Sequence, residues 1–148
     1  MNRAAHPKNP HIRNGLIARW LILFSRRPQH LPARILAFFA GCEFGVALPL
    51  TTFLPHPQGV VVGSRVQLGE NVVIGQQVTL GGRDLDLDHM PVIHDGVYLG
   101  AGCKVLGQVV VGRGAIVGAN AVVTKDVPAG AVVVGANRIL AGHTSPYA

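Results

Sequence analysis

The sequence predicts a mainly β protein: a parallel β-helix of hexapeptide repeats that follows a short N-terminal helical arm. The first observation is a ladder of aliphatic residues spaced six apart between residues 62 and 128. A period of six fits neither the 3.6-residue period of an α-helix nor the two-residue period of a strand, so it indicates a repeating tertiary unit. The ladder is Val62, Leu68, Ile74 and Leu80, then Ile93, Leu99, Val105, Val111, Val117 and Val123.

The second observation is that the residues around each ladder position also repeat. Glycine comes next at positions 63, 69, 75, 81, 100, 112 and 118, and it allows a sharp turn. Four places after each aliphatic stands a small or branched residue: Val66, Val72, Val78, Val97, Cys103, Val109, Ala115, Ala121 and Val127. We expect both sets to point into a narrow prism whose coils stack at about the 4.8 Å spacing of strands.

The N-terminal residues predict two helices after a loose leader of about ten residues. From residue 12 to residue 25, apolar residues recur at helical spacing on one face: Ile12, Leu16, Trp20, Leu23 and Phe24. Pro28 ends this helix, and a second helix begins near Pro32, runs through Phe39 and ends at Gly41. We expect the apolar face to cover the open end of the β-helix, and contact with a membrane surface is the alternative.

The net charge of +6 is concentrated at the N-terminus. Residues 1–42 hold seven arginine or lysine residues and no acid, whereas the other 106 residues hold six basic and seven acidic residues. A basic arm can meet nucleic acid or an anionic membrane. Because the arm lacks interleaved aromatics and any nucleic-acid-binding motif, we expect no nucleic-acid partner.

Cysteine content and hydropathy give an expectation for the cellular compartment of the protein. Cys42 and Cys103 are too few for a disulfide framework, which favours a reduced, cytoplasmic setting. The apolar run from residue 16 to residue 24 is interrupted by Arg19 and is too short to span a bilayer. The scarcity of aromatics, 5% of the chain, predicts an aliphatic core.

The repeat is broken in two places, and each break contains a histidine. Between residues 42 and 59 a strict frame would put His56 inside the prism, so we expect an irregular first coil that turns it outward. Between Leu80 and Ile93 the spacing is thirteen, so about seven residues form a loop. Loops on rigid scaffolds often carry function. This loop carries Arg83, Asp84, Asp86, Asp88 and His89.

Histidine is the side chain best suited to act as a base near neutral pH. We expect His6, His11, His30 and His143 to be solvated, and His94 to lie on the surface of a corner. His56 and His89 are the candidates because a repeat protein without function at those points would continue its frame.

Three segments resemble the hexapeptide-repeat acetyltransferases, in the branch of the serine acetyltransferases and the short polysaccharide O-acetyltransferases. They are Leu54-Pro55-His56-Pro57-Gln58-Gly59-Val60-Val61-Val62-Gly63, Gln76-Gln77-Val78-Thr79-Leu80-Gly81-Gly82 and Asp88-His89-Met90-Pro91-Val92-Ile93. The resemblance implies a left-handed β-helix over residues 42–142, after an arm of residues 1–41 and before a tail of residues 143–148. It also implies acetyl-CoA as co-substrate and a homotrimer with active sites between subunits.

By the same resemblance, neighbouring subunits bring His56 and His89 together. One ring takes the proton of the acceptor, and which one does so stays open. Glu43 matches a family acid that would orient His89 and fix its tautomer, and a solvated surface charge is the alternative.

The resemblance also implies where the donor binds. Its pantetheine arm would lie along Gly82, Ala101 and Ala119, where small residues let a thin chain approach the backbone. Lys125 would meet the phosphates, with Arg138 assisting. No histidine or cysteine spacing predicts a metal site.

The acceptor is the least determined part. Serine acetyltransferases carry Asp where this chain has Pro55, and Arg where it has Asp88, whose charge would repel an amino-acid carboxylate. We therefore expect a sugar hydroxyl as the small-molecule acceptor. Asp84, Asp86 and Asp88 could accept hydrogen bonds from it, and a solvated acidic loop without such a role is the alternative. L-serine is the alternative, and a non-catalytic β-helix scaffold is another.

Overall fold

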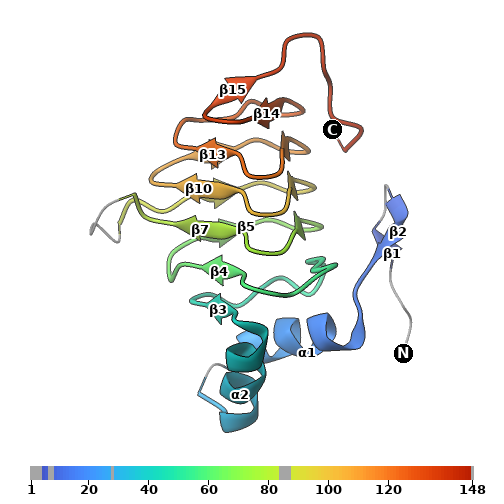
Figure 1. Ribbon diagram of the computed structural model, residues 1–148, viewed down its shortest axis with the longest axis vertical. Coiled ribbons are helices and arrows are strands. Elements are labelled where there is room, and N and C mark those ends of the chain that lie inside the picture. The colour runs from blue at the N-terminus through green and yellow to red at the C-terminus, as the bar shows by residue number, and fades with distance from the viewer. Residues whose placement is uncertain (1–4, 7–8, 28, 84–87, 148) are drawn as a thin grey trace.

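The computed structural model describes residues 5–6, 9–27, 29–83 and 88–147 and has the predicted architecture, a left-handed parallel β-helix above two short helices (Figure 1). Very short strands repeat along three flat walls, and each of the three middle coils contributes one strand to each wall. The chain passes from wall 1 to wall 2, then to wall 3, and back to wall 1 one coil higher.

The strands of each wall pair in parallel, apart from one. Wall 1 holds β3 Glu43–Phe44, β4 Val61–Val62, β7 Thr79–Gly81, β10 Lys104–Leu106 and β13 Val122–Val123. Wall 2 holds β5 Gln67–Leu68, β8 Val92–Ile93 and β11 Val110–Val111. Wall 3 holds β6 Val73–Ile74, β9 Tyr98–Leu99, β12 Ile116–Val117 and β14 Val132–Val134, with β15 Arg138–Ile139 added antiparallel at the end.

The register shows that the loop is inserted without disturbing the coils. Val62 pairs with Leu80, eighteen residues later, which is three repeats of six. Leu80 pairs with Val105, twenty-five residues later, and Val105 with Val123, again eighteen. The seven extra residues lie between β7 and β8, as the spacing of the ladder predicts, and β7 and β8 keep their places in the stack (Figure 1).

The core is the inside of the prism. Every ladder residue is buried except Leu68, and every residue at the second inward position is buried, which confirms both predicted sets. Leu68 is half-buried because β5 is the lowest strand of wall 2 and has no strand below it. Burial raises the pKa of the Cys103 thiol to about 12, so this side chain stays neutral and packs as a small apolar group.

Glycine at the turns is required by the stacking of the coils. A Cβ atom on Gly100 would lie 2.7 Å from the backbone nitrogen of Ala119 and 2.8 Å from the carbonyl oxygen of Val117 in the next coil. Both of these are backbone atoms, which cannot move aside as a flexible side chain can.

The arm forms two helices, α1 Leu16–Ser25 and α2 Leu31–Ala40. The second has the predicted ends, with a proline in its first turn and Gly41 after it at a φ of 61°. The first begins at Leu16 and not at residue 12, because β2 Asn9–Arg13 pairs antiparallel with β1 Ala5–His6 where we expected a loose leader.

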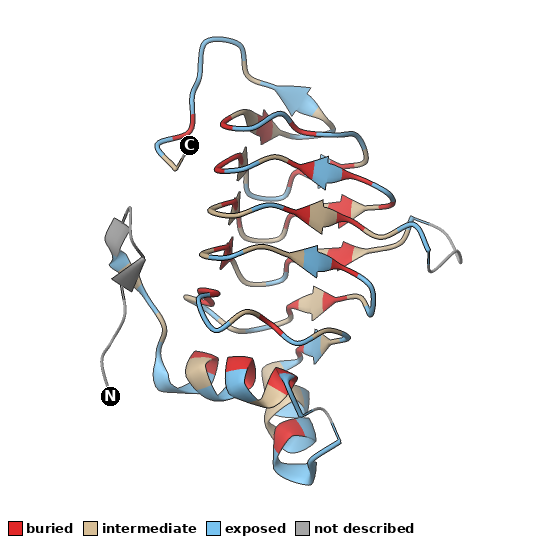
Figure 2. Cartoon of the chain, turned by 180° about the vertical axis from the view of Figure 1, so that it is seen from behind, coloured by how far each residue is buried: buried red, intermediate tan, exposed pale blue. Residues whose placement is uncertain are grey.

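The face of α1 that covers the prism is not the predicted one. Leu16, Trp20 and Leu23 are exposed, whereas Ala18 and Leu21 are buried against the core (Figure 2). Both sides of α1 are apolar, so either could cover the prism, and the side that does so packs Leu21 and Ile22 with Ala18 into the core. A hydrogen bond fixes this packing: the backbone nitrogen of Leu48 donates to Ser25 Oγ over 3.0 Å.

The chain after β14 folds back along the prism. The backbone nitrogen of Ser145 donates to the carbonyl oxygen of Gly130 over 2.9 Å, and the ring of Tyr147 stacks on that of Tyr98 with centroids 5.5 Å apart. The boundaries proposed at residues 41, 42 and 142 stay predictions. Neither α1 nor α2, nor any other stretch in the described ranges, has the length and apolarity of a bilayer-spanning helix.

Candidate active site

A hollow of about 210 Å³ lies at the corner between wall 1 and wall 2, beside the loop that joins β7 to β8. Two loop residues, Arg83 and His89, line one part of it, and both are exposed. The rest is made by corner residues of the two coils above: Leu106, Gly107, Gln108 and Thr124.

Local packing explains why the loop can lie so close to this corner. Gly107 has a φ of 89°, its nitrogen donates to the carbonyl oxygen of Gly81 over 2.9 Å, and a Cβ atom there would lie 3.3 Å from Cβ of Arg83. Thr124 Oγ1 accepts a hydrogen bond from Asn137 Nδ2 over 2.9 Å, which orients this hydroxyl at the upper edge of the hollow.

The charge around His89 differs from the sequence-based expectation. Asp88 pairs with the guanidinium of Arg65, which comes from the same corner one coil lower. Its charge is therefore balanced, and Arg83 lines the hollow as a second cation. The predicted repulsion of an amino-acid carboxylate by Asp88 loses its basis, because the sequence alone could not pair Asp88 with a residue 23 positions earlier. Asp84 and Asp86 lie outside the described residues.

His56 lies at a different corner, where wall 3 turns back into wall 1 in the first coil. Its side chain is exposed, as expected from the broken frame. The segment around it is well fixed. The backbone N–H of the buried Leu54 donates to Asn14 Oδ1 over 2.7 Å. The backbone N–H of Gln77 donates to the carbonyl oxygen of Gln58 over 2.8 Å.

The two histidines therefore lie at opposite edges of wall 1. At about 3.3 Å per residue, one side of six residues spans up to about 20 Å, which exceeds the size of a small acceptor. His89 also lines a hollow beside the third and higher coils, whereas His56 belongs to the first. Within one chain the structure does not bring the two rings together, so any site that uses both must include a second copy.

Glu43 lies in β3, the lowest strand of wall 1, and is exposed. It lines a hollow against the helices and not the hollow that contains His89. Its backbone nitrogen donates to the carbonyl oxygen of Val60 over 2.9 Å, and the adjacent Cys42 Sγ lies 3.5 Å from the carbonyl oxygen of Pro57. Within one chain Glu43 is therefore next to the segment of His56.

The residues predicted to bind the donor divide between the same two corners. Ala101 and Ala119 stack one above the other at the corner between wall 3 and wall 1, where the nitrogen of Asn120 donates to the carbonyl oxygen of Ala101 over 2.8 Å. Gly82 lies at the corner of His89. Lys125 and Arg138, both exposed, directly follow the Thr124–Asn137 pair at the upper end.

Sequence reasoning gave no role to Arg83, Arg65 or Thr124. Thr124 could have been noticed because it takes the hexad position that glycine fills elsewhere, and Arg83 because it directly follows the Gly81-Gly82 turn. Arg65 had no such signal, since its pairing with Asp88 depends on the inserted loop. Within the described part of the chain, no three His, Cys, Asp or Glu residues gather as metal ligands would.

Comparison with known proteins gives a consistent result. The family described as bacterial transferase hexapeptide (six repeats) matches residues 90–125. Serine acetyltransferase of Bacillus pumilus is 40% identical over 133 residues, which is 82% of this chain and 61% of the relative. The chain thus spans about three fifths of the length of the curated relatives it matches.

Solved structures agree. A soybean serine acetyltransferase complexed with serine matches with a TM-score of 0.59 and 36% identity, over 82% of this chain and 54% of that one. A Brucella abortus serine acetyltransferase in complex with coenzyme A matches with a TM-score of 0.62 and 28% identity, over 84% and 52%. These relatives support the serine alternative better than the sugar acceptor expected from the sequence.

Proposed function

We propose that this chain, which matches the hexapeptide-repeat transferase family over residues 90–125 and is similar to serine acetyltransferases, transfers the acetyl group of acetyl-CoA to the hydroxyl of a small acceptor, with L-serine as the first candidate. The observation that carries the proposal is the position of two exposed histidines at opposite edges of wall 1. One of them lies beside a hollow that also contains a cation, Arg83.

The proposed reaction needs one base. The acceptor oxygen attacks the thioester carbonyl while an imidazole nitrogen takes the hydroxyl proton. The tetrahedral intermediate then collapses, the C–S bond breaks, and the protonated imidazole returns the proton to the departing thiolate of CoA. His56 and His89 are the candidates for this base.

We propose that the site forms between two copies, with His56 from one and His89 from its neighbour. Each corner carries only part of what the reaction needs, since His89 and Arg83 lie at one edge of wall 1 and His56 with Ala101 at the other. Ring-shaped assemblies join two different patches of the same surface, so a trimer would form three equivalent sites.

The same partition gives Glu43 a revised role. Because Glu43 lies next to the segment of His56 within one chain, we propose that its carboxylate orients His56 and not His89.

L-serine replaces a sugar as the first acceptor for two reasons. The curated relatives reported above are named serine acetyltransferases. The hollow beside His89 contains a guanidinium, which is the natural partner of a carboxylate, and a neutral sugar would not need it.

Acetyl-CoA fits the small residues and cations that remain. Ala101 and Ala119 form a column of methyl-sized side chains against which the pantetheine arm can lie. Lys125 and Arg138 provide positive charge for the phosphates at the upper end of the prism.

The test is release of CoA, followed with a thiol-reactive dye, in the presence of L-serine or a panel of sugars. We expect turnover with serine, and a decrease of about 10²–10⁴-fold for His56→Ala and for His89→Ala. His94→Ala is the matched control, because this ring is also exposed on a corner but lies outside the hollow. Turnover with a sugar but not with serine would show that the acceptor is a sugar, as the sequence alone suggested. No turnover with either would favour a non-catalytic scaffold.

Mixing the two inactive variants tests the shared site. In a ring, random assembly of His56→Ala and His89→Ala subunits rebuilds about one quarter of the sites, because only one order of neighbours supplies both rings. Recovery of activity after co-refolding would support the proposal. No recovery, with intact assembly, would contradict it.

A further inference from the structure

Helix α2 carries its larger apolar side chains on the side that faces away from the protein. Its inner side is mostly alanine, with Ala33 buried and Ala37 and Ala40 half-buried against the core, and Leu36 is the larger side chain that packs there. Its outer face carries Phe38 and Phe39, which are 80% and 81% exposed, together with Leu31 and Ile35. A surface helix normally has the opposite arrangement, with its apolar stripe facing the core and a polar face toward solvent.

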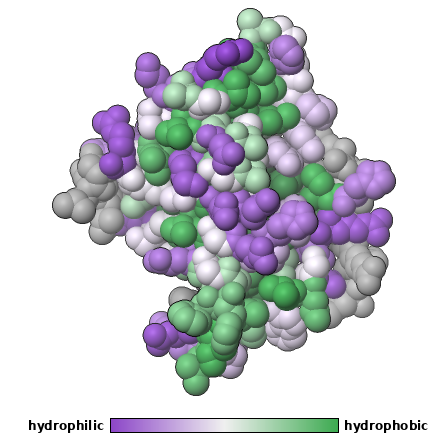
Figure 3. Space-filling model, in the orientation of Figure 1, coloured by the Kyte–Doolittle hydropathy of each residue, from purple (hydrophilic) through white to green (hydrophobic). Residues whose placement is uncertain are grey.

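Helix α1 also carries large apolar side chains on its outer face, although its inner face is apolar too. Ala18, Leu21 and Ile22 face the prism and are buried. Leu16, which is 72% exposed, and Trp20, which is 45% exposed, lie on the outer face, and the ring of Trp20 stacks on Phe24 with centroids 5.2 Å apart. Figure 3 shows apolar side chains gathered at the end of the molecule that the helices form.

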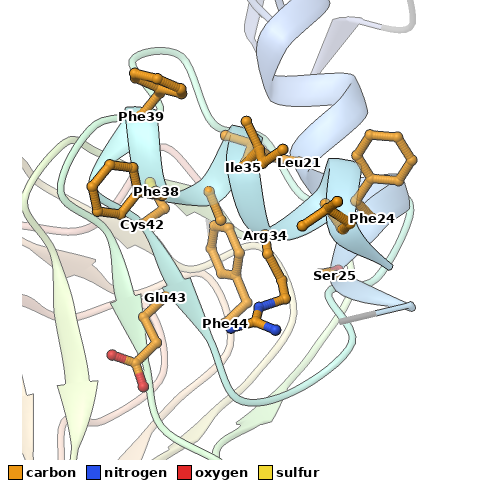
Figure 4. A pocket seen from close by; sticks show the side chains of 13 residues that line it. Leu21, Phe24, Ser25, Arg34, Ile35, Phe38, Phe39, Cys42, Glu43 and Phe44 are labelled. Carbon is orange, nitrogen blue, oxygen red and sulfur yellow. The ribbon is translucent and has the colours of Figure 1, made fainter. Parts of the chain in front are cut away.

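Between the helices lies a hollow of about 900 Å³ with mainly apolar walls (Figure 4). Phe24, Ile35, Phe38 and Phe44 line it. The charged side chains at this hollow are Arg34, from α2, and Glu43, from β3. Such a volume is in the range of ligand-binding clefts, and exposed apolar patches of this kind mark interaction surfaces.

The charge of the arm indicates what covers this surface. Residues 1–42 contain seven basic residues and no acid, and Arg26, Arg27 and Arg34 are exposed next to the apolar faces. A second copy meeting the same surface would bring two strongly positive arms together, at an electrostatic cost. The occupant that fits both properties is anionic and apolar.

We propose that the outer faces of α1 and α2 dock on an anionic phospholipid surface. The helices are too short to span a bilayer and lie instead in the plane of its interface. The apolar side chains, Trp20 and Phe38 among them, enter the boundary between headgroups and acyl chains. The arginines lie at the level of the phosphates, and the prism with its site stands clear of the surface on the other side of the helices (Figure 1).

The test is sedimentation of the full chain with vesicles of phosphatidylcholine alone or mixed in equal parts with phosphatidylglycerol. We expect binding to the mixed vesicles that weakens at high salt. Arg26→Gln with Arg27→Gln should weaken binding by about thirtyfold, since each basic residue near an anionic surface contributes about 1 kcal/mol. Phe38→Ser with Phe39→Ser should weaken it by about tenfold or more.

The controls change the same kinds of residue on the prism. Val110→Ser with Val122→Ser replaces two exposed apolar side chains, and Arg113→Gln with Arg138→Gln removes two exposed charges. Both should bind as the unchanged chain does. The thermal midpoint of every variant shows that it is folded.

Trp20, the single tryptophan of the chain, reports insertion directly. Its fluorescence should shift to shorter wavelength on the mixed vesicles and be quenched by lipids brominated along the acyl chain. Equal binding to neutral vesicles, or binding that the arm variants do not change, would overturn the proposal. It would also be overturned if Phe38→Ser with Phe39→Ser altered the oligomeric state and no vesicles were bound, because the surface would then be a contact between proteins.

Discussion

The β-helix and the arm use similar apolar side chains in opposite directions. In the prism, Leu99 and the other aliphatics point inward and are almost completely buried, and small residues occupy the turns. In the arm, the inner sides of the helices are buried as well, but large apolar side chains such as Phe38 also point outward. The stacking of coils gives every inward side chain of the prism a partner above and below, whereas nothing else in the described chain covers the outer face of the helices. Apolar content therefore indicates stability in one region and an external partner in the other.

The largest expected effect is on the stability of the prism. Leu99→Ala should lower the free energy of unfolding by about 2–5 kcal/mol, because Leu99 is completely buried and its cavity cannot collapse between stacked coils. Phe38→Ala, the matched change in the arm, removes more atoms but should change stability by less than about 0.5 kcal/mol. Denaturant unfolding measures both. Similar losses in the two variants would contradict the comparison.

The next effect concerns the turns of the prism. Gly100→Ala should cost about 1–3 kcal/mol, because the added Cβ would lie 2.7 Å from a backbone nitrogen. Gly81→Ala is the control, since a Cβ there meets no atom within 4 Å. If both substitutions were equally tolerated in thermal unfolding, the coils would be less tightly stacked than we describe.

A smaller effect is expected where the two regions meet. Ser25→Ala removes the acceptor for the buried N–H of Leu48 and should cost about 1–2 kcal/mol, in the lower part of the range for an unpartnered buried group. Proteolysis should then cut first within α1. The exposed Ser64→Ala is a control without such a role. Uniform protection of α1 in the Ser25 variant would show that packing alone holds the arm.

The smallest expected effect is on the thermal stability of the protein at low pH. The pKa of Asp95 is lowered mainly by the backbone N–H of Glu70, which donates to it over 3.0 Å, and then by the nearby Arg113. The stabilisation is therefore present above the pKa of an unfolded aspartate, about 3.9, and is lost as the pH falls through the lowered value. Asp95→Asn should make the fall of the thermal midpoint below about pH 4 slightly shallower. An unchanged slope would contradict this.

Much of the prism could be predicted from the sequence because a period of six determines which side chains point inward and which positions stack on one another. Val62, Leu80 and Val105 had to stack, and the extra residues before Ile93 had to leave as a loop. The orientation of the helices could not be predicted, because α1 is apolar on both sides and periodicity cannot say whether Trp20 or Leu21 faces inward.

The site was predictable only in part. The breaks in the repeat identified His56 and His89 as outward residues. Their placement at opposite edges of wall 1, and the pairing of Arg65 with Asp88, depend on contacts between coils that one-dimensional spacing does not contain.

The uniform stacking of coils has a consequence for distance. Every coil adds about 4.8 Å of height, and the seven-residue insertion shows that a coil can change its length without shifting those above it. The number of coils therefore fixes the distance between the helices and the hollow that contains His89. Adding one eighteen-residue coil between β4 and β7 would lift that hollow by one step and leave its composition intact.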